Sequence, residues 1–173
     1  MLVHLPLSRG RSLSRGAAAR APNPVAALGV PAHVTVLFPF VSPPQIDAEV
    51  LRRVAAVAAT VSPFDYRLST TAWFNHDVVH LAPDNPAPFV DLTTRIHAAF
   101  PDYPPYGGQY SEPIPHLTIG HGGDLTTLSA AEKTVLAHPP VTGRAYRLTL
   151  MVEEPGGHWV PRLVFHRMRR RIP

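Results

Sequence analysis

Hydrophobic and polar residues alternate in the same way in two short stretches of the chain. The stretch 33–36 reads His-Val-Thr-Val and the stretch 116–119 reads His-Leu-Thr-Ile. Side chains two positions apart on a strand point to the same face. Each stretch is therefore predicted to be a strand that turns an imidazole and a hydroxyl to one side and two apolar side chains into a core.

A second pair of segments repeats at nearly the same offset. Tyr66–Ser69 reads Tyr-Arg-Leu-Ser and Tyr146–Thr149 reads Tyr-Arg-Leu-Thr. A helix-like stretch precedes each of them, Gln45–Thr60 in the first half and Leu125–His138 in the second, and an apolar strand follows each. Parts that recur in one order indicate an internal repeat. We interpret the chain as two lobes related by approximate two-fold symmetry.

The remaining pattern predicts further strands, one more helix and one long loop. Apolar residues recur three to four apart over residues 89–100, which predicts an amphipathic helix. Ser42, followed by two prolines and Gln45, has the residue order of a helix start. Ser8–Pro24 is expected to be a short helix or a mobile loop, and Pro101–Pro115 has the composition of a functional loop. Strands are predicted over Met1–Leu7, Gly29–Phe40, Phe64–Phe74, Val78–Leu81, Arg144–Glu153 and Trp159–His166.

Strands interleaved with only a few helices and joined by hairpin-type turns indicate an α+β fold. We expect two pseudo-symmetric lobes of antiparallel sheet, flanked by helices, with an active-site cleft between them. The approximate repeats would cover residues 1–76 and 77–166 of a single bilobal domain that spans residues 1–173. Because such a design is self-contained, it favours a monomer.

Composition narrows the classes of protein that fit. Hydrophobic residues make up 45% of the 173 residues, which is enough for a core and excludes a wholly disordered chain. The absence of cysteine excludes a disulfide framework and a cysteine nucleophile. No apolar run approaches the roughly 20 residues that span a bilayer, so we expect a cytoplasmic protein without a membrane partner. The net charge of +4 comes almost entirely from arginine, which suits phosphate but also an ordinary solvated surface.

The two motifs resemble the signature of the 2H phosphoesterase superfamily, which includes the 2′-5′ RNA ligase and RNA 2′,3′-cyclic phosphodiesterase proteins. That signature is a pair of His-x-Thr/Ser-x motifs on matching strands of two lobes, and residues 33–36 and 116–119 fit it. The resemblance extends over about Gly29 to His166. It implies a metal-independent enzyme, without a cofactor, that opens a 2′,3′-cyclic phosphate at an RNA end or on a small nucleotide to a 2′-phosphate. It also implies weak reverse 2′-5′ RNA ligation.

Histidine and threonine suit this chemistry. Cleaving a phosphodiester without a metal requires one proton taken from the attacking oxygen and one given to the leaving oxygen, and imidazole does both near neutral pH. A threonine hydroxyl can donate a hydrogen bond to a phosphate oxygen. The resemblance implies that His33 protonates the leaving 3′ oxygen, that His116 activates water, and that Thr35 and Thr118 hold the phosphate. Because the site is nearly symmetric, membership of this set is better founded than the assignment of acid and base.

Other side chains are candidates either for substrate contacts or for the core. Aromatic rings can stack on a nucleobase at the cleft mouth, although they are more often core residues, and a histidine just past the second motif could line the cleft. The candidates for substrate binding are Phe38, Phe40, Tyr106, Tyr110 and His121. Four other histidines are interpreted as structural, because their spacing does not suit local metal chelation. They are His76, His80, His158 and His166.

Two other classes of function remain open. One is a non-catalytic RNA- or nucleotide-binding module of the same fold, which the presence of both intact motifs disfavours. The other is a metal-dependent hydrolase built on some of the ten histidines, which EDTA would inhibit. The sequence does not distinguish an RNA fragment from a cyclic mononucleotide or an ADP-ribose-type cyclic phosphate as the substrate.

Overall fold

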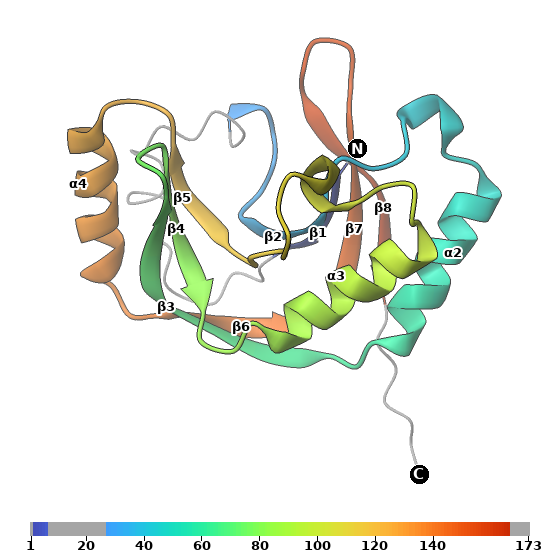
Figure 1. Ribbon diagram of the computed structural model, residues 1–173, viewed down its shortest axis with the longest axis horizontal. Helices are drawn as coiled ribbons and strands as arrows, with labels where there is room; N and C mark the ends of the chain where they lie inside the picture. Colours follow the sequence, from blue (N-terminus) through green and yellow to red (C-terminus); the bar gives the residue numbers. More distant parts are fainter. Residues whose placement is uncertain (1, 7–26, 167–173) are drawn as a thin grey trace.

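The computed structural model describes residues 2–6 and 27–166, which form two antiparallel sheets and three α-helices (Figure 1). The strands are β1 Leu2–Pro6, β2 His33–Leu37, β3 Phe64–Phe74, β4 Val78–Pro83, β5 Leu117–His121, β6 Val141–Ala145, β7 Arg147–Glu153 and β8 Trp159–His166. Their order is β2-β1-β7-β8 in the first sheet and β5-β4-β3-β6 in the second. The expected α+β fold with two antiparallel sheets is confirmed.

Each sheet takes strands from both halves of the chain. The first motif strand and β1 are completed by β7 and β8, whereas the second motif strand and β4 are completed by β3 and β6. Counted from the motif strand, the strands with the two Tyr-Arg-Leu segments, β7 and β3, are each third in their sheet. Strands β1 and β4 are each second. The apolar strands that follow these segments are not equivalent, because β4 lies inside its sheet and β8 lies at an edge.

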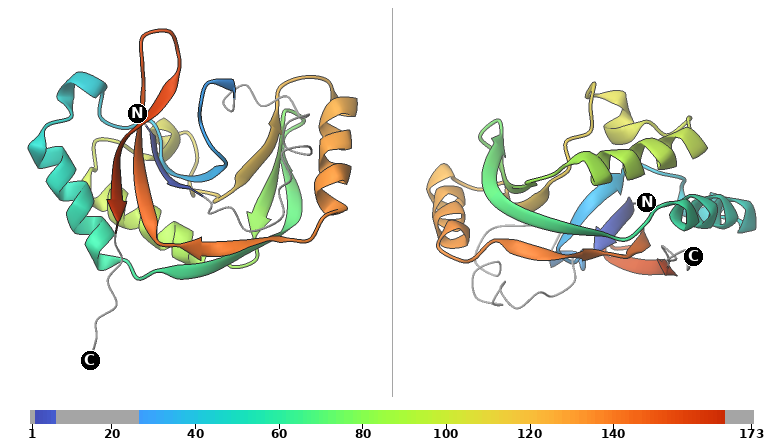
Figure 2. Two further views of the ribbon diagram at one scale, coloured as in Figure 1. Left: turned by 180° about the vertical axis from the view of Figure 1, so that it is seen from behind. Right: turned by 90° about the horizontal axis from the view of Figure 1, so that it is seen from below.

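Three helices cover the outer faces of the sheets. They are α2 Ala48–Thr60, α3 Ala87–Ala99 and α4 Leu125–Leu136. Helix α3 contacts β2 and α2 contacts α3, whereas α4 packs on β3, β4 and β5. Figure 2 shows α4 at one end of the molecule and α2 and α3 at the other, with the long strand β3 running between the two ends. The junction of the two sheets consequently lies between the helical ends.

Helices α2 and α4 start at aspartates, and α2 does not start at the predicted serine. Asp47 accepts a hydrogen bond from the N–H of Val50 at 2.8 Å and caps α2, as Asp124 caps α4. The Ser42 hydroxyl instead donates to the Gln45 side chain at 2.7 Å, within a separate 3₁₀ turn over Pro43–Gln45. The prediction of an α-helix start at Ser42 is therefore wrong, because Asp47 satisfies the free N–H groups of the α-helix.

Two of the predicted strands differ most from those observed, while Met1–Leu7 is observed as Leu2–Pro6 and Val78–Leu81 as Val78–Pro83. The stretch Gly29–Phe40 is a strand only over His33–Leu37, since the prolines on either side lack the N–H that a ladder needs. The predicted strand Arg144–Glu153 is interrupted at Tyr146. Strand β6 ends there in the second sheet and β7 begins in the first, so this residue is where the chain changes sheets. The strand propensity of residues 144–153 does not reveal that the chain passes from one sheet to the other within them.

Both motif strands bury their apolar side chains in one common core. Val34, Val36, Leu117 and Ile119 are all less than 8% exposed and belong to the same cluster of contacting residues. The histidine and threonine that alternate with them are only partly buried. The alternation predicted from the sequence is confirmed on both strands.

Ser8–Pro24, expected to be a short helix or a mobile loop, lies outside the described residues. Within the described ranges, no helix is both long enough and apolar enough to cross a membrane.

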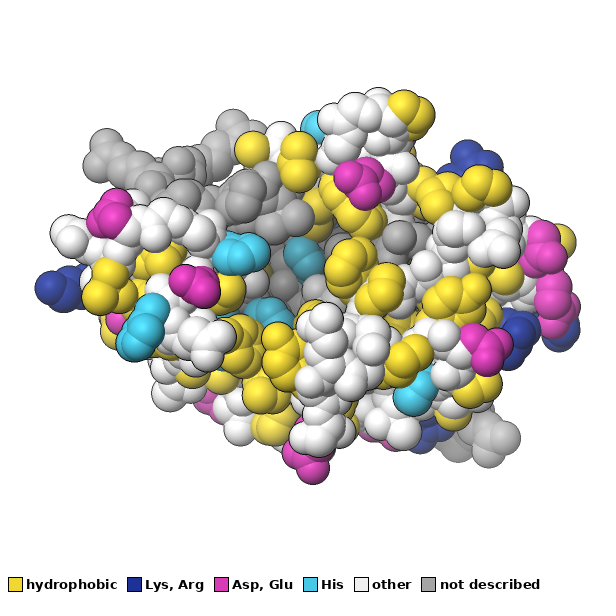
Figure 3. Space-filling view, turned by 45° about the horizontal axis from the view of Figure 1, so that its top comes forward, with side chains coloured by type: hydrophobic (Ala, Val, Ile, Leu, Met, Phe, Trp, Pro, Cys, Tyr) yellow, Lys and Arg dark blue, Asp and Glu magenta, His cyan; other side chains and the backbone are white. Residues whose placement is uncertain are grey.

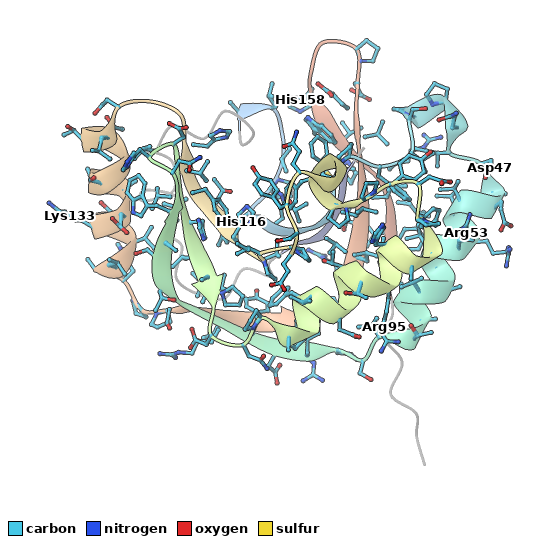
Figure 4. All side chains as sticks on the ribbon, in the orientation of Figure 1. Asp47, Arg53, Arg95, His116, Lys133 and His158 are labelled. Atoms are coloured by element: carbon cyan, nitrogen blue, oxygen red, sulfur yellow. The ribbon has the colours of Figure 1, made fainter. Side chains whose placement is uncertain are left out.

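Arg53 joins α2 to the end of α3, and its loss is predicted to destabilise the fold. Its guanidinium donates to the carbonyl of Ala99 and lies 4.5 Å from the centre of the Phe100 ring (labelled in Figure 4). We expect Arg53→Ala to lower the free energy of unfolding by about 2 kcal/mol, since a partly buried charged hydrogen bond and a cation–π contact are both lost. Urea denaturation measures this change.

The neighbouring Arg52 provides the matched control. Its side chain is 71% exposed and its only described partner is Glu49, one turn away on the helix surface. Arg52→Ala should leave the denaturation midpoint nearly unchanged. Equal losses from the two variants would contradict a special role for Arg53.

Candidate active site

The two motif histidines are held by the same local hydrogen bond. Nδ1 of His33 lies 2.7 Å from the carbonyl oxygen of Pro31, and Nδ1 of His116 lies 2.7 Å from that of Ile114. Because a carbonyl oxygen only accepts, Nδ1–H donates in both cases, and Nε2 is the basic nitrogen of each neutral ring. The residue two positions before each histidine therefore sets its orientation and its tautomer.

The segment that leads to His33 is hydrogen-bonded to the β7–β8 hairpin. The N–H of Trp159 donates to the carbonyl of Leu28 at 2.7 Å. Gly29 follows with a φ of 91°, a conformation that favours glycine, and a Cβ atom there would lie 2.5 Å from Nε2 of His158 (labelled in Figure 4). Only glycine lets the chain pass so close to the hairpin before it enters the motif strand.

The junction of the two sheets brings the motifs together. Strands β2 and β5 are edge strands of different sheets, and their Cα atoms approach to within 8 Å of one another. His116 lies in the middle of the molecule, between the two sheets (Figure 4). Figure 3 shows histidine side chains around a hollow near the centre of one face, with hydrophobic side chains on its rim.

Burial lowers the pKa values of both motif histidines. Burial is the main cause of the lowered pKa of His33, the bond to Pro31 partly opposes it, and the charge of a protonated His116 lowers this pKa further. Burial also lowers the pKa of His116, against the bond to Ile114. Because a charge on His116 disfavours a proton on His33, the two rings are not readily protonated together.

The first motif is connected to the long loop. The Thr35 hydroxyl lies 3.2 Å from Nε2 of His33, and the Tyr106 hydroxyl also bonds to Thr35. The N–H of Tyr106 donates to the carbonyl of Phe38 at 2.6 Å, and Tyr106 has a φ of 52°. Burial raises the pKa of Tyr106, so the phenol keeps its proton near neutral pH and can donate a hydrogen bond. The loop thus brings a second hydroxyl group to this half of the site.

The second motif lies against two aromatic rings. The ring centre of His116 is 4.9 Å from that of Phe74 and 5.2 Å from that of His80. His80 is 2% exposed and stacks on Phe74 at 4.2 Å, and its register partner on β5 is Thr118. Burial, followed by the charge on His116, lowers the pKa of His80 to about 4. His80 was interpreted as structural from the sequence, and its contact with His116 becomes visible only through the pairing of β4 with β5.

The other candidates are distributed unevenly around the motifs. Phe38 is 40% exposed and packs edge-on against Trp159, and the exposed Tyr110 contacts Tyr106. Phe40 is buried among core rings, so it does not line the hollow in this structure. The exposed His121 lies five residues beyond His116, roughly 17 Å along an extended chain.

No three histidine, aspartate or glutamate side chains gather in a way that could hold a metal ion within residues 2–6 and 27–166.

Comparison with known proteins places the chain in a family. Residues 10–157 match the model of the 2′-5′ RNA ligase superfamily. This match covers most of the sequence and agrees with the paired histidine motifs, so the chain belongs to the 2′-5′ RNA ligase (2H phosphoesterase) superfamily. No curated protein matches the chain significantly.

Solved structures share the fold at low sequence identity. TT0787 of Thermus thermophilus has a TM-score of 0.57 and 17% identity, with 95% of this chain and 96% of that chain covered. LigT of E. coli, solved with 3′-AMP, has a TM-score of 0.56 and 15% identity, with 97% of both chains covered. A structure described as a phosphoesterase has a TM-score of 0.56 and 18% identity, again with 97% of both chains covered. These likenesses extend over nearly the whole length of each protein.

The buried His80 makes stability depend on pH in a predictable direction. In the folded state it stays neutral down to about pH 4, whereas in the unfolded chain it takes up a proton near its ordinary value of 6.5. The unfolded state therefore binds more protons in this window, and stability is lost as the pH falls from 6.5 toward 4. For His80 alone we expect a loss of about 2–3 kcal/mol between pH 7.5 and pH 4.5.

Replacing His80 with phenylalanine should remove that part of the loss, as measured by urea unfolding at the two pH values. His138→Ala is the control, because His138 is only partly buried and lies just beyond the end of α4. If His80→Phe loses as much stability on acidification as the wild type does, the neutral, buried state of His80 is refuted.

Proposed function

We propose that the protein is a metal-independent 2′,3′-cyclic phosphodiesterase that opens the cyclic phosphate of an RNA end or a small nucleotide to a 2′-phosphate. One observation carries the proposal. Two histidines with the same Nδ1–carbonyl bond come together from two edge strands, each with a threonine two residues further on. In each neutral ring Nε2 is the basic nitrogen, and it is the nitrogen that exchanges protons with substrate.

The proposed reaction needs one base and one acid. Water attacks phosphorus and loses a proton to one Nε2 atom, the bond from phosphorus to the 3′ oxygen breaks, and the other imidazolium gives its proton to that oxygen. Thr35 and Thr118 donate to the non-bridging oxygens, whose charge grows as water adds. The product is a 2′-phosphomonoester with a free 3′ hydroxyl, and each turnover consumes one water. By microscopic reversibility the same groups support weak 2′-5′ ligation.

The electrostatic interaction between the two histidines is compatible with one acting as the acid and the other as the base. Because the two rings are not readily protonated together, a pair that holds one proton has one acid and one base at the same pH. The family resemblance gives the acid role to His33 and the base role to His116. In the free protein burial lowers the pKa of both rings, so these shifts do not assign the acid and the base. We propose that these four residues form the catalytic set, and a leaving-group experiment decides which histidine is the acid and which is the base.

Aromatic rings near the first motif are proposed to bind the nucleoside. Phe38 and Tyr110 are exposed, Tyr106 is partly buried and contacts Tyr110, and a base can stack on such rings. The E. coli LigT structure contains 3′-AMP, which supports a nucleotide as the ligand of this fold. Phe40, being buried, and His121, being distant, are left out of this subsite. Because one chain contributes all these groups, we also propose that the protein acts as a monomer.

The catalytic proposal predicts hydrolysis in EDTA that depends on both histidines. We expect wild type to convert 2′,3′-cyclic nucleotides, or a short RNA with a cyclic phosphate end, to the 2′-phosphate. His33→Ala and His116→Ala should each lose at least about 100-fold in kcat/KM, the scale of general acid or base catalysis. Thr35→Val and Thr118→Val should each lose about 100-fold, because a donor to the developing charge is removed.

His138→Ala is the matched control and should keep wild-type activity, since the His138 ring bonds to the carbonyl of Thr134 in α4 and belongs to neither motif. Loss of activity in EDTA, restored by added metal, would support a metal-dependent hydrolase instead. Folded protein that binds nucleotide but does not turn over any of these substrates would support the non-catalytic binding module.

An activated leaving group separates the acid from the base. An aryl phosphodiester with a nitrophenolate leaving group needs no protonation on departure, so the variant that lacks the acid should retain nearly full activity on it. The variant that lacks the base should remain impaired on both substrates. If His33→Ala is the one rescued, the roles implied by the family hold, and if His116→Ala is rescued, they are reversed. Equal impairment of both variants on the aryl ester would contradict a division into acid and base.

A further inference from the structure

His80 occupies a position that its packing alone does not explain. It lies on β4, directly opposite Thr118 of the second motif, and its ring centre is 5.2 Å from that of His116. The ring also stacks on Phe74 with 4.2 Å between the ring centres, and Phe74 itself lies 4.9 Å from the His116 ring. His80 is therefore in direct contact with a motif histidine, although neither motif contains it.

The imidazole at this position carries an energetic cost. Nδ1 of His80 is buried without a hydrogen-bond partner. A buried polar atom without a partner destabilises a protein, whereas a phenyl ring would fill the same space without that cost. The stack on Phe74 would be available to a phenyl ring as well. What phenylalanine would not supply is a polar ring beside His116.

The first sheet repeats the placement. Strand β1 holds the same second position beside its motif strand that β4 holds in the other sheet. The residue opposite Thr35 in the register of β1 is His4, just as His80 is opposite Thr118. A histidine thus stands opposite the threonine of each motif, at two equivalent places in the fold.

We propose that His80 is a positioning residue for His116: its neutral ring, backed by Phe74, holds the motif imidazole in place and gives it a polar neighbour. The catalytic consequence rests on the proposed function, whereas the contact between the two rings does not. The hydrogen bond to Ile114 fixes one edge of the His116 ring, and the two aromatic rings limit its tilt.

Among the described residues, these titratable groups face the pair or lie on the neighbouring strands. His33 from β2 interacts with His116 across the junction of the sheets. On β3, the residue opposite His80 is the uncharged Ala72, and Glu132 on α4 bonds to the indole N–H of Trp73 at 3.0 Å. Trp73 alternates with Phe74 along β3, which places this carboxylate on the other face of the sheet. His4 lies in the register of the first sheet, beside the other motif. A change at His80 should therefore be felt directly by His116.

The test is an NMR titration of the His116 ring in wild type and in His80→Phe, with the resonance assigned through His116→Gln. Phenylalanine makes the surroundings of His116 more apolar, which disfavours its charged form, so His116 should titrate at lower pH than in wild type. On the cyclic phosphate substrate, kcat should fall about tenfold with KM unchanged within about twofold, because a misplaced base or acid affects the reaction and not the binding. Thermal unfolding of the variant should occur at a higher temperature.

His80→Gln separates polarity from position and serves if His80→Phe does not fold. Glutamine keeps a polar group but not the ring, so His116 should titrate near its wild-type pH while kcat still falls. If both variants leave the titration of His116 and kcat unchanged, His80 is only a core residue and the proposal is overturned. If wild type hydrolyses none of the substrates but His80→Phe still shifts the titration, the proposed function fails and the coupling of the two rings stands.

Discussion

The pleat of two edge strands is the constraint on which the rest of the structure depends. Each motif strand must bury one face in the common core and leave the other at the junction of the sheets. The face in the core is formed by Val34 and Val36 on one strand and by Leu117 and Ile119 on the other. Since side chains alternate, the histidine and threonine of each motif are then turned to the junction. A register slip by one residue would place both imidazoles in the core.

The local patterns were sufficient to predict elements but not their partners. The strand Phe64–Phe74 was predicted with its observed bounds, and the four apolar residues at helical spacing between residues 89 and 100 are all buried. The interruption at Tyr146 could not be predicted, because β6 and β7 read as one continuous strand until their different partners are known. The true start of α2 was missed because Ser42 offered a plausible signal earlier in the chain, whereas Asp47 makes the cap.

For the candidate site, too, local patterns predicted some features and missed others. The four motif residues were predicted because their spacing matches the strand period, and the structure brings both motif strands to one junction. The Nδ1 bonds to Pro31 and Ile114 depend on backbone geometry that a pattern does not contain. His80 was assigned a structural role because a lone histidine in an apolar run resembles any core histidine. Its neighbour His116 is distant in sequence and adjacent only through strand pairing.

The central claim, that the two motif histidines act together as one acid and one base, is tested most directly by the dependence of kcat/KM on pH. The measurement would use a 2′,3′-cyclic nucleotide in EDTA, with wild type beside the two alanine variants. The account predicts a bell-shaped profile for wild type, with one limb missing in each variant. A wild-type profile that rises or falls through a single ionisation, or that keeps both limbs after either histidine is removed, would contradict it.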